Sequence, residues 1–194
     1  MIHLIANKIV ENLASLTIVD KITGIVKPAK VYINNVVKTY PIAYNTDPDV
    51  CSQSQLLDFV PDSSKRSIIY FEDYGTSQVK LENQKAYWQA TFRLIVWFNY
   101  KKILPVMSEP SLIALNVLNL IPGDLGNFDN LQGVFIEVTS QLPNDVSPFS
   151  RYSYQEERTQ YVTYPYDYVA FVLRAEFSTR IGCIDDLTPT LSIC

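Results

Sequence analysis

The chain has 194 residues, of which 47% are hydrophobic and 19% charged, and its formal net charge is −4. This length provides one domain with a substantial core. The acidic balance argues against a dedicated nucleic-acid-binding protein, because phosphate recognition needs a concentrated basic face. The 13 tyrosines and 9 phenylalanines suit surfaces that become buried only on association.

Motifs for catalysis, metal binding or nucleotide binding do not occur in the sequence. Cys51, Cys183 and Cys194 form no CxxC or Cys/His cluster, so we predict no zinc site. Unpaired thiols in a reducing compartment are the expectation, and a Cys183–Cys194 disulfide is left open. His3 is the single histidine and no Walker or GxGxxG sequence is present, so we expect no enzyme and no cofactor. Adjacent carboxylates, as at 72–73, leave a hydrolase as a third interpretation.

The N-terminal part of the chain predicts a helix followed by strands. Residues 2–16 place isoleucine and leucine at helical spacing. They show no signal-peptide pattern, and apolar runs elsewhere stop at about ten residues, so we expect folding in the cytoplasm and no membrane segment. Residues 18–26 predict a short strand. Residues 30–40 predict a hairpin that turns at two asparagines, which tolerate a positive φ.

The middle of the chain predicts a loop, a strand and then an unusually long strand. Residues 45–66 are rich in Asp, Ser, Gln and Pro, which indicates a long loop with at most a short helix over 54–59. Residues 67–73 predict a strand and 74–83 an exposed turn. Residues 85–100 alternate over about fifteen positions, whereas a mean strand has roughly 5–6 residues.

The last third of the chain predicts a helix and two more strands. Ser108 and Pro110 predict the start of a nearly all-apolar helix over 112–121, buried on most sides. Residues 122–132 predict a turn-rich connection, followed by a strand over 134–142. Residues 166–180 alternate as the second long strand. At about 3.3 Å per residue each long strand spans roughly 50 Å, so we expect it to curl or to meet another subunit.

These elements predict an α+β fold with a mainly antiparallel, twisted sheet, packed by an N-terminal and a central helix. We expect a single domain over 1–180, with loop insertions at 45–66 and 143–165, and a C-terminal tail over 181–194.

The candidate contact residues lie on the long strands and in the tyrosine-rich insertion before the second one. On the strands, Arg174 either pairs with Glu176 on a solvated face or meets a neighbouring subunit. The insertion either folds back on its own domain, docks on a partner or stacks on carbohydrate. The candidate subunit interface is Arg93, Trp97, Tyr152, Tyr154, Arg158, Tyr161, Tyr164, Tyr166, Tyr168 and Arg174.

In element order the chain resembles the tail-terminator, tail-completion and head–tail connector proteins of tailed bacteriophages. The stretches that carry this resemblance are 2–16, 67–100, 112–121, 134–142 and 166–180. The resemblance implies a structural protein of the virion that is assembled in the host cytoplasm as a homo-oligomeric ring. Such a ring contacts portal, connector or tail proteins, and DNA passes its lumen without specific binding. The alternative is a non-enzymatic glycan- or protein-binding module of a virion or cell surface that uses the tyrosine-rich loop.

Overall fold

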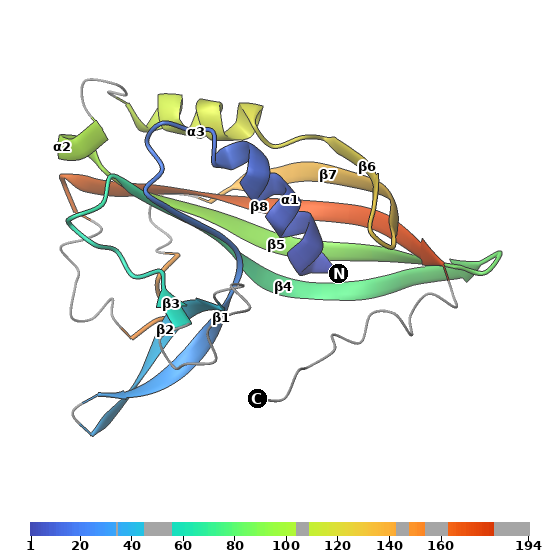
Figure 1. The fold of residues 1–194 in the computed structure, drawn as a ribbon, viewed down its shortest axis with the longest axis horizontal. Helices are drawn as coiled ribbons and strands as arrows, with labels where there is room; N and C mark the ends of the chain where they lie inside the picture. The colour runs from blue at the N-terminus through green and yellow to red at the C-terminus, as the bar shows by residue number, and fades with distance from the viewer. Residues whose placement is uncertain (34, 45–55, 104–108, 143–147, 154–162, 181–194) are drawn as a thin grey trace.

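A long, twisted sheet carries the fold of the computed structural model (Figure 1). The structure describes residues 1–33, 35–44, 56–103, 109–142, 148–153 and 163–180. Within these ranges the elements are α1 (Ile2–Leu13), β1 (Lys21–Ile33), β2 (Val36–Tyr44), β3 (Leu56–Asp58), β4 (Ser67–Glu82), β5 (Lys85–Asn99), α2 (Tyr100–Ile103), α3 (Pro110–Asn119), β6 (Asp124–Phe128), β7 (Leu131–Gln141) and β8 (Tyr166–Arg180).

The strands in the described ranges form one eight-stranded sheet in the order β3-β2-β1-β4-β5-β8-β7-β6. Neighbouring strands are antiparallel except for β1 and β4, which run parallel. The predicted α+β fold is therefore confirmed, with a sheet that is mixed rather than wholly antiparallel. The predicted tail, 181–194, lies outside the described residues.

Both long strands predicted from the sequence are present and are neighbours. β5 and β8 pair along their whole length, from Lys85 opposite Arg180 to Asn99 opposite Tyr166. The N-terminal helix is also present, although it ends at Leu13 rather than at residue 16. The predicted hairpin exists as β1 and β2, which are longer than expected.

Three predictions of local structure were wrong, because pairing with a neighbouring strand overrode local preference. Residues 74–82 continue β4 instead of turning, and every one of them is solvent-exposed, so no alternation marks them as a strand. β3 replaces the short helix expected within 54–59. β6 occupies the predicted connection over 122–132, with irregular pairing to β7 around Gly126, whose φ is +66°.

The first core lies between the helices and one face of the sheet (Figure 1). α1 contributes Ile5, Ile9 and Leu13, which repeat at helical spacing and are fully buried. On the sheet, the rings of Phe71 and Phe92 lie 5.9 Å apart beneath them. This core packs the central strands against the helices.

Helix α3 is less buried than its apolar sequence predicts. Ile113 and Val117 reach the first core, whereas Leu112 and Leu115 are exposed, so burial on most sides was a wrong expectation. The helix begins at Pro110, as expected, and its N-cap residue is Glu109. Ser108, the predicted cap, lies outside the described residues.

A second, smaller core lies on the opposite face of the sheet. Its largest members are aromatic: Trp97, Tyr70, Phe59, Phe149 and Tyr168. Phe149 belongs to the described segment 148–153 and meets Tyr168 edge-on at 5.6 Å between ring centroids. This core covers only the part of the second face that lies next to β1 and β2.

Candidate assembly surface

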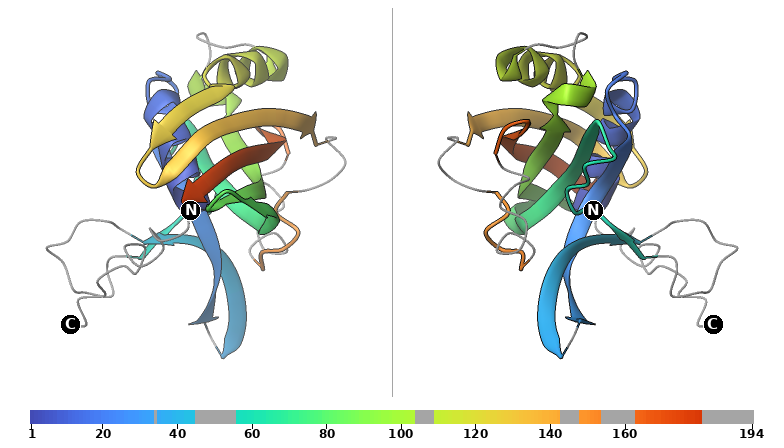
Figure 2. Two further views of the ribbon diagram at one scale, coloured as in Figure 1. Left: turned by 90° about the vertical axis from the view of Figure 1, so that its right-hand side faces the viewer. Right: turned by 90° about the vertical axis from the view of Figure 1, so that its left-hand side faces the viewer.

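The hairpin of β1 and β2 projects from the body of the molecule, away from the helices (Figures 1 and 2). β1 changes partner along its length: residues 21–26 pair with β4, and residues 27–33 pair only with β2 in the described sheet. We call this projecting part, residues 27–33 and 35–42, the arm. Beyond its base, where Ile42 also pairs with Asp58 of β3, the arm is two strands wide, and an isolated two-stranded hairpin is marginal in water.

The arm exposes apolar side chains near its tip. Tyr32 is 78% exposed, Val36 56% and Val37 42%. The register places Tyr32 directly opposite Val37, so both side chains lie on the same face of the arm. Asn35 turns the chain at the tip with a φ of 62°, which a β-branched residue would adopt only with strain.

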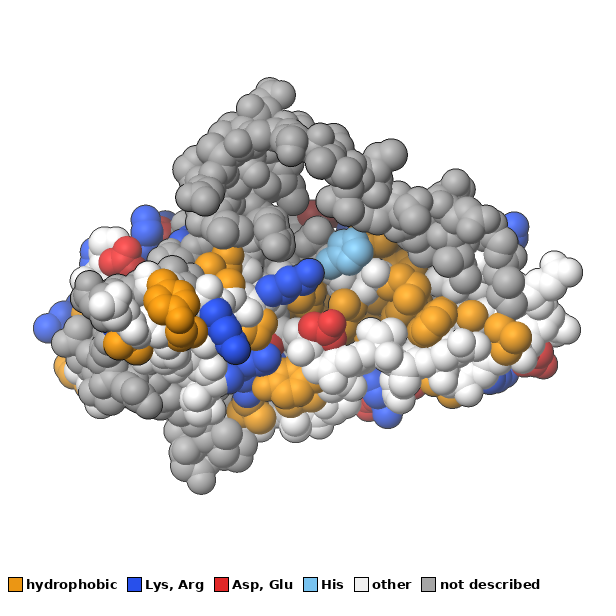
Figure 3. All heavy atoms as spheres, turned by 90° about the horizontal axis from the view of Figure 1, so that it is seen from below, with side chains coloured by type: hydrophobic (Ala, Val, Ile, Leu, Met, Phe, Trp, Pro, Cys, Tyr) orange, Lys and Arg blue, Asp and Glu red, His pale blue; other side chains and the backbone are white. Residues whose placement is uncertain are grey.

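The arm is also basic. Lys27, Lys30 and Lys38 lie within residues 27–42, and no acidic residue does. In the view from below, hydrophobic side chains lie beside lysine and arginine side chains at the end of the molecule where the arm projects (Figure 3). The arm therefore presents apolar and cationic groups together.

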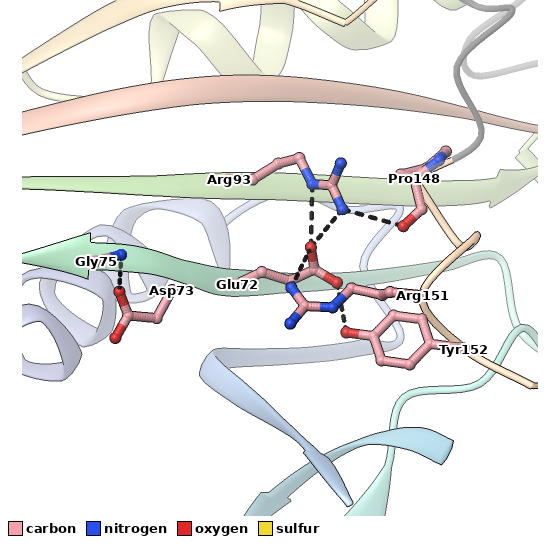
Figure 4. A network of polar contacts seen from close by, with 7 residues as sticks. All are labelled: Glu72, Asp73, Gly75, Arg93, Pro148, Arg151 and Tyr152. Carbon is pink, nitrogen blue, oxygen red and sulfur yellow. Dashed lines mark hydrogen bonds and ion pairs between the residues drawn. The ribbon is translucent and has the colours of Figure 1, made fainter. Parts of the chain in front are cut away.

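A buried charged cluster lies close to the base of the arm (Figure 4). Glu72 on β4 and Arg93 on β5 are directly opposite in the sheet, and both are buried. Arg93 donates to Oε2 of Glu72 from Nε at 3.0 Å and from Nη2 at 2.5 Å. The hydroxyl of Tyr152 donates to Oε1 of the same carboxylate, and Nη1 of Arg151 lies 3.4 Å from Oε2. We call these four residues the Glu72 cluster.

The Glu72 cluster fixes the segment 148–153 on the sheet, and that segment in turn holds the arm. Arg93 Nη2 donates to the carbonyl of Pro148 at 3.1 Å. At the other end of the segment, the amide of Thr39 on β2 donates to the Ser153 hydroxyl at 2.9 Å. The Ser153 amide returns a hydrogen bond to the Thr39 carbonyl at 3.1 Å. A chain of polar contacts thus runs from β5 to the arm.

The second arginine of the cluster is more exposed than the first. Burial disfavours the Arg151 cation, but its interactions with Glu72, Tyr152 and Tyr74 together outweigh burial and raise the pKa of Arg151 above its usual value. The Tyr74 ring lies 5.1 Å from the Arg93 guanidinium carbon and 5.8 Å from that of Arg151. Both contacts fall within the range of cation–π attraction.

A bend in β4 follows the cluster directly. Gly75 has a φ of +120°, and its amide donates to Oδ1 of Asp73 at 2.7 Å (Figure 4). The pairing of β4 with β5 shifts register between Asp73 and Thr76. Glu72 is buried and Asp73 exposed, as expected for adjacent residues of a strand, whose side chains point to opposite faces.

Several predicted interface residues pack inside the protomer itself. Trp97 is fully buried and stacks on Tyr166 at 5.4 Å between ring centroids. Arg93, Tyr152 and Tyr168 are also buried. Their side chains belong to the second core and to the Glu72 cluster, so they leave little surface for a neighbouring subunit. Of these residues only Tyr152 belongs to the insertion over 143–165, and its buried side chain fits the interpretation that this part of the insertion folds back on its own domain.

The other predicted residues are exposed or lie outside the described ranges. Tyr164 is 78% exposed and stacks on Tyr100, with 6.4 Å between the ring centroids. Arg174 is half-exposed; its Nη2 lies 2.5 Å from Glu137 on β7, and its Nε lies 3.6 Å from Glu176. Tyr154, Arg158, Tyr161 and the three cysteines lie outside the described residues.

Sequence reasoning noted Glu72 only as one of two adjacent carboxylates and missed its burial against Arg93; it also missed the exposed tip of the arm. The burial of Glu72 left no signal in the sequence, because its partners are set by strand register and by a distant loop. The tip of the arm did carry a signal in the sequence: residues 31–37 consist of tyrosine, valine and isoleucine, and their only polar side chains besides the tyrosine hydroxyl are those of two asparagines. A hairpin of that composition has no second layer to pack on unless another surface supplies it.

Within the described residues, no group of three or more His, Cys, Asp or Glu side chains could hold a metal ion. No helix in the described ranges is long and apolar enough to cross a membrane. The chain matches no protein-family model and no curated protein.

Proposed function

We propose that this protein is a structural subunit of a tailed bacteriophage that forms a closed homo-oligomeric ring. The ring lies at the head–tail junction or in the tail and joins portal to tail around the DNA channel. The observation that carries the proposal is the arm, a projecting hairpin whose tip exposes Tyr32, Val36 and Val37. The resemblance in element order supports the same role.

The arm is better explained by assembly than by the needs of the isolated protomer. Exposed apolar side chains gathered on a projecting element are typical of a surface that another protein covers. The arm occupies one end of the molecule (Figure 1). A contact between this end and a different surface of the next copy is heterologous, and heterologous contacts generate closed rings when the rotation between copies closes.

The charge of the chain is compatible with a channel through which DNA moves. Its net charge of −4 provides no general attraction for phosphate groups, since non-specific DNA binding depends on clustered lysine and arginine. In this proposal DNA passes the lumen without being held. The subunit contacts, rather than any catalytic group, supply the function.

The first test is the oligomeric state of the full chain. Size-exclusion chromatography with light scattering should give one mass that is a multiple of the protomer mass, and negative-stain images should contain rings. A protein that is monomeric at every concentration, with no ring in the images, refutes the proposal. Glycan binding by such a monomer would favour the alternative binding module.

A pair of matched variants tests the arm as the origin of assembly. Tyr32 and Tyr164 are the same residue type, and both are 78% exposed. Tyr32→Ala should dissociate the ring. Tyr164→Ala removes a residue of the interface predicted from the sequence, and it should leave the ring intact if the arm rather than the tyrosine-rich region makes the contact. If Tyr164→Ala dissociates the ring and Tyr32→Ala does not, the arm does not form the subunit contact. Antibody labelling of virions at the head–tail junction or tail tests the location.

A further inference from the structure

A groove lies at the end of the sheet opposite the arm. Its cavity of about 630 Å³ is bounded by β4, β5, β7 and β8, and its lining includes Tyr87, Gln132, Phe135 and Glu176. A smaller cavity of about 240 Å³ adjoins it and shares Phe135 and Glu176. These strand ends lie at the far right of Figure 1, whereas the arm projects at the lower left.

The groove is lined by apolar and charged side chains, and two carboxylates lie beside one guanidinium where the smaller cavity adjoins it. Phe135 is 56% exposed on β7 and lies directly opposite Glu176 on β8. Glu137 lies opposite Arg174, so the two carboxylates of this patch share one guanidinium. Two lysines also line the groove: Lys80, which is paired with Glu82 at 2.8 Å, and Lys85 at the start of β5, directly opposite Glu82. The excess of carboxylate over cation is therefore confined to Glu137, Glu176 and Arg174.

The arm carries the complementary groups at the same spacing. Lys30 and Tyr32 are two residues apart on β1, so they lie on the same face, with Val37 opposite Tyr32. Phe135 and Glu137 are likewise two residues apart on β7. On each surface an aromatic side chain therefore lies about 7 Å from a charged one. The charge is positive on the arm, at Lys30, and negative on β7, at Glu137.

We propose that the arm of one copy docks in this groove of the next copy. Tyr32 and Val37 cover Phe135, and Lys30 faces Glu137 and Glu176. The proposal rests on the ring assigned above and specifies its contact. Because the arm and the groove lie at opposite ends of the molecule (Figure 1), each copy presents its arm on one side and its groove on the other, as a heterologous ring contact requires.

The charge pairing can be tested by reversal in the full chain. Lys30→Glu and Glu137→Lys should each weaken subunit association roughly five- to tenfold, as expected for exposed charges. The double variant should recover most of that loss. Both positions are exposed, so circular dichroism should confirm that each variant folds. Mass photometry over a dilution series measures the association.

Photo-crosslinking locates the contact independently. A benzoylphenylalanine at position 32, in rings mixed from light and heavy-isotope copies, should crosslink between copies to peptides that contain Tyr87 or Phe135. The same group at position 164 is the control and should not label those peptides. Intercopy crosslinks at the groove, together with rescue by the double reversal, support the docking.

The possible failures are distinguishable. If the wild type never associates, the ring and the docking are both wrong. If rings form and Tyr32→Ala dissociates them, but Glu137→Lys has no effect and the crosslinks fall elsewhere, the arm docks on another surface. That second result overturns the docking inference and leaves the ring standing.

Discussion

Replacing Glu72 by glutamine should destabilise the protein far more than the same change at Glu137. Each glutamate meets an arginine on the neighbouring strand, and in both pairs the shortest N–O distance is 2.5 Å. The difference is burial. The Arg93 and Glu72 side chains are 10% and 1% exposed, against 42% and 58% for Arg174 and Glu137.

The expected magnitudes follow from the surroundings of the charge left behind. Glu72→Gln leaves the Arg93 cation buried without its carboxylate, which typically costs about 3–5 kcal/mol. Glu137→Gln leaves Arg174 in contact with water, where exposed pairs contribute about 0–1 kcal/mol. For a domain of this size the first change should lower the melting temperature by roughly 6–20 °C and the second by less than about 4 °C.

Urea unfolding followed by far-ultraviolet circular dichroism measures both free energies. All proteins should be compared at one low concentration, because association adds to apparent stability. Arg93 keeps its hydrogen bond to the Pro148 carbonyl in the Glu72→Gln variant, so the loss should fall below that of a fully isolated buried charge. Equal losses for the two variants would refute the argument that burial decides the energy of these pairs.

Three further changes probe the second core, the arm and an exposed ion pair. Trp97→Ala should cost about 3–5 kcal/mol of unfolding free energy; a loss below about 1 kcal/mol in denaturant titration would contradict its fully buried position. Asn35→Val should speed amide exchange in the arm, because φ is 62° there, whereas Asn35→Gly should not. Burial favours neutral Asp20, but hydrogen bonds from Arg66 prevail and hold its pKa below 3.8. The stability advantage over Asp20→Asn should therefore be full above about pH 4 and shrink as acid protonates the folded carboxyl; a pH-independent difference would refute it.

The sequence predicted the elements whose pattern is local and periodic. β5 and β8 have one face of large apolar side chains that the helices cover, so alternation marked them almost to the residue. Helix α1 was predicted equally well, since Ile5, Ile9 and Leu13 are all buried in the first core. These elements can be predicted from the sequence because each packs one face against a single layer, which gives its apolar residues a single regular spacing.

The outer half of β4 and the Glu72 cluster were not predicted, because both depend on residues that are distant along the chain. The outer half of β4 is exposed on both faces, so its strand character comes from pairing with β5 and leaves no alternation. Glu72 becomes a buried centre only because register brings Arg93 opposite and the segment 148–153 covers it. Register and loop docking are tertiary properties that a periodic pattern does not contain.

The two long strands β5 and β8 pass through two different environments on the sheet face opposite the helices. Near Trp97 that face is covered by the protomer's own second core, whereas near Tyr87 and Glu176 no described segment covers it and it forms the groove. The boundary falls at Arg93, where side chains of β5 on this face change from Ile95 and Trp97 to polar groups. The covered half suffices to anchor the arm. The other half lines the groove, where the docking proposed above would place the arm of a neighbouring copy.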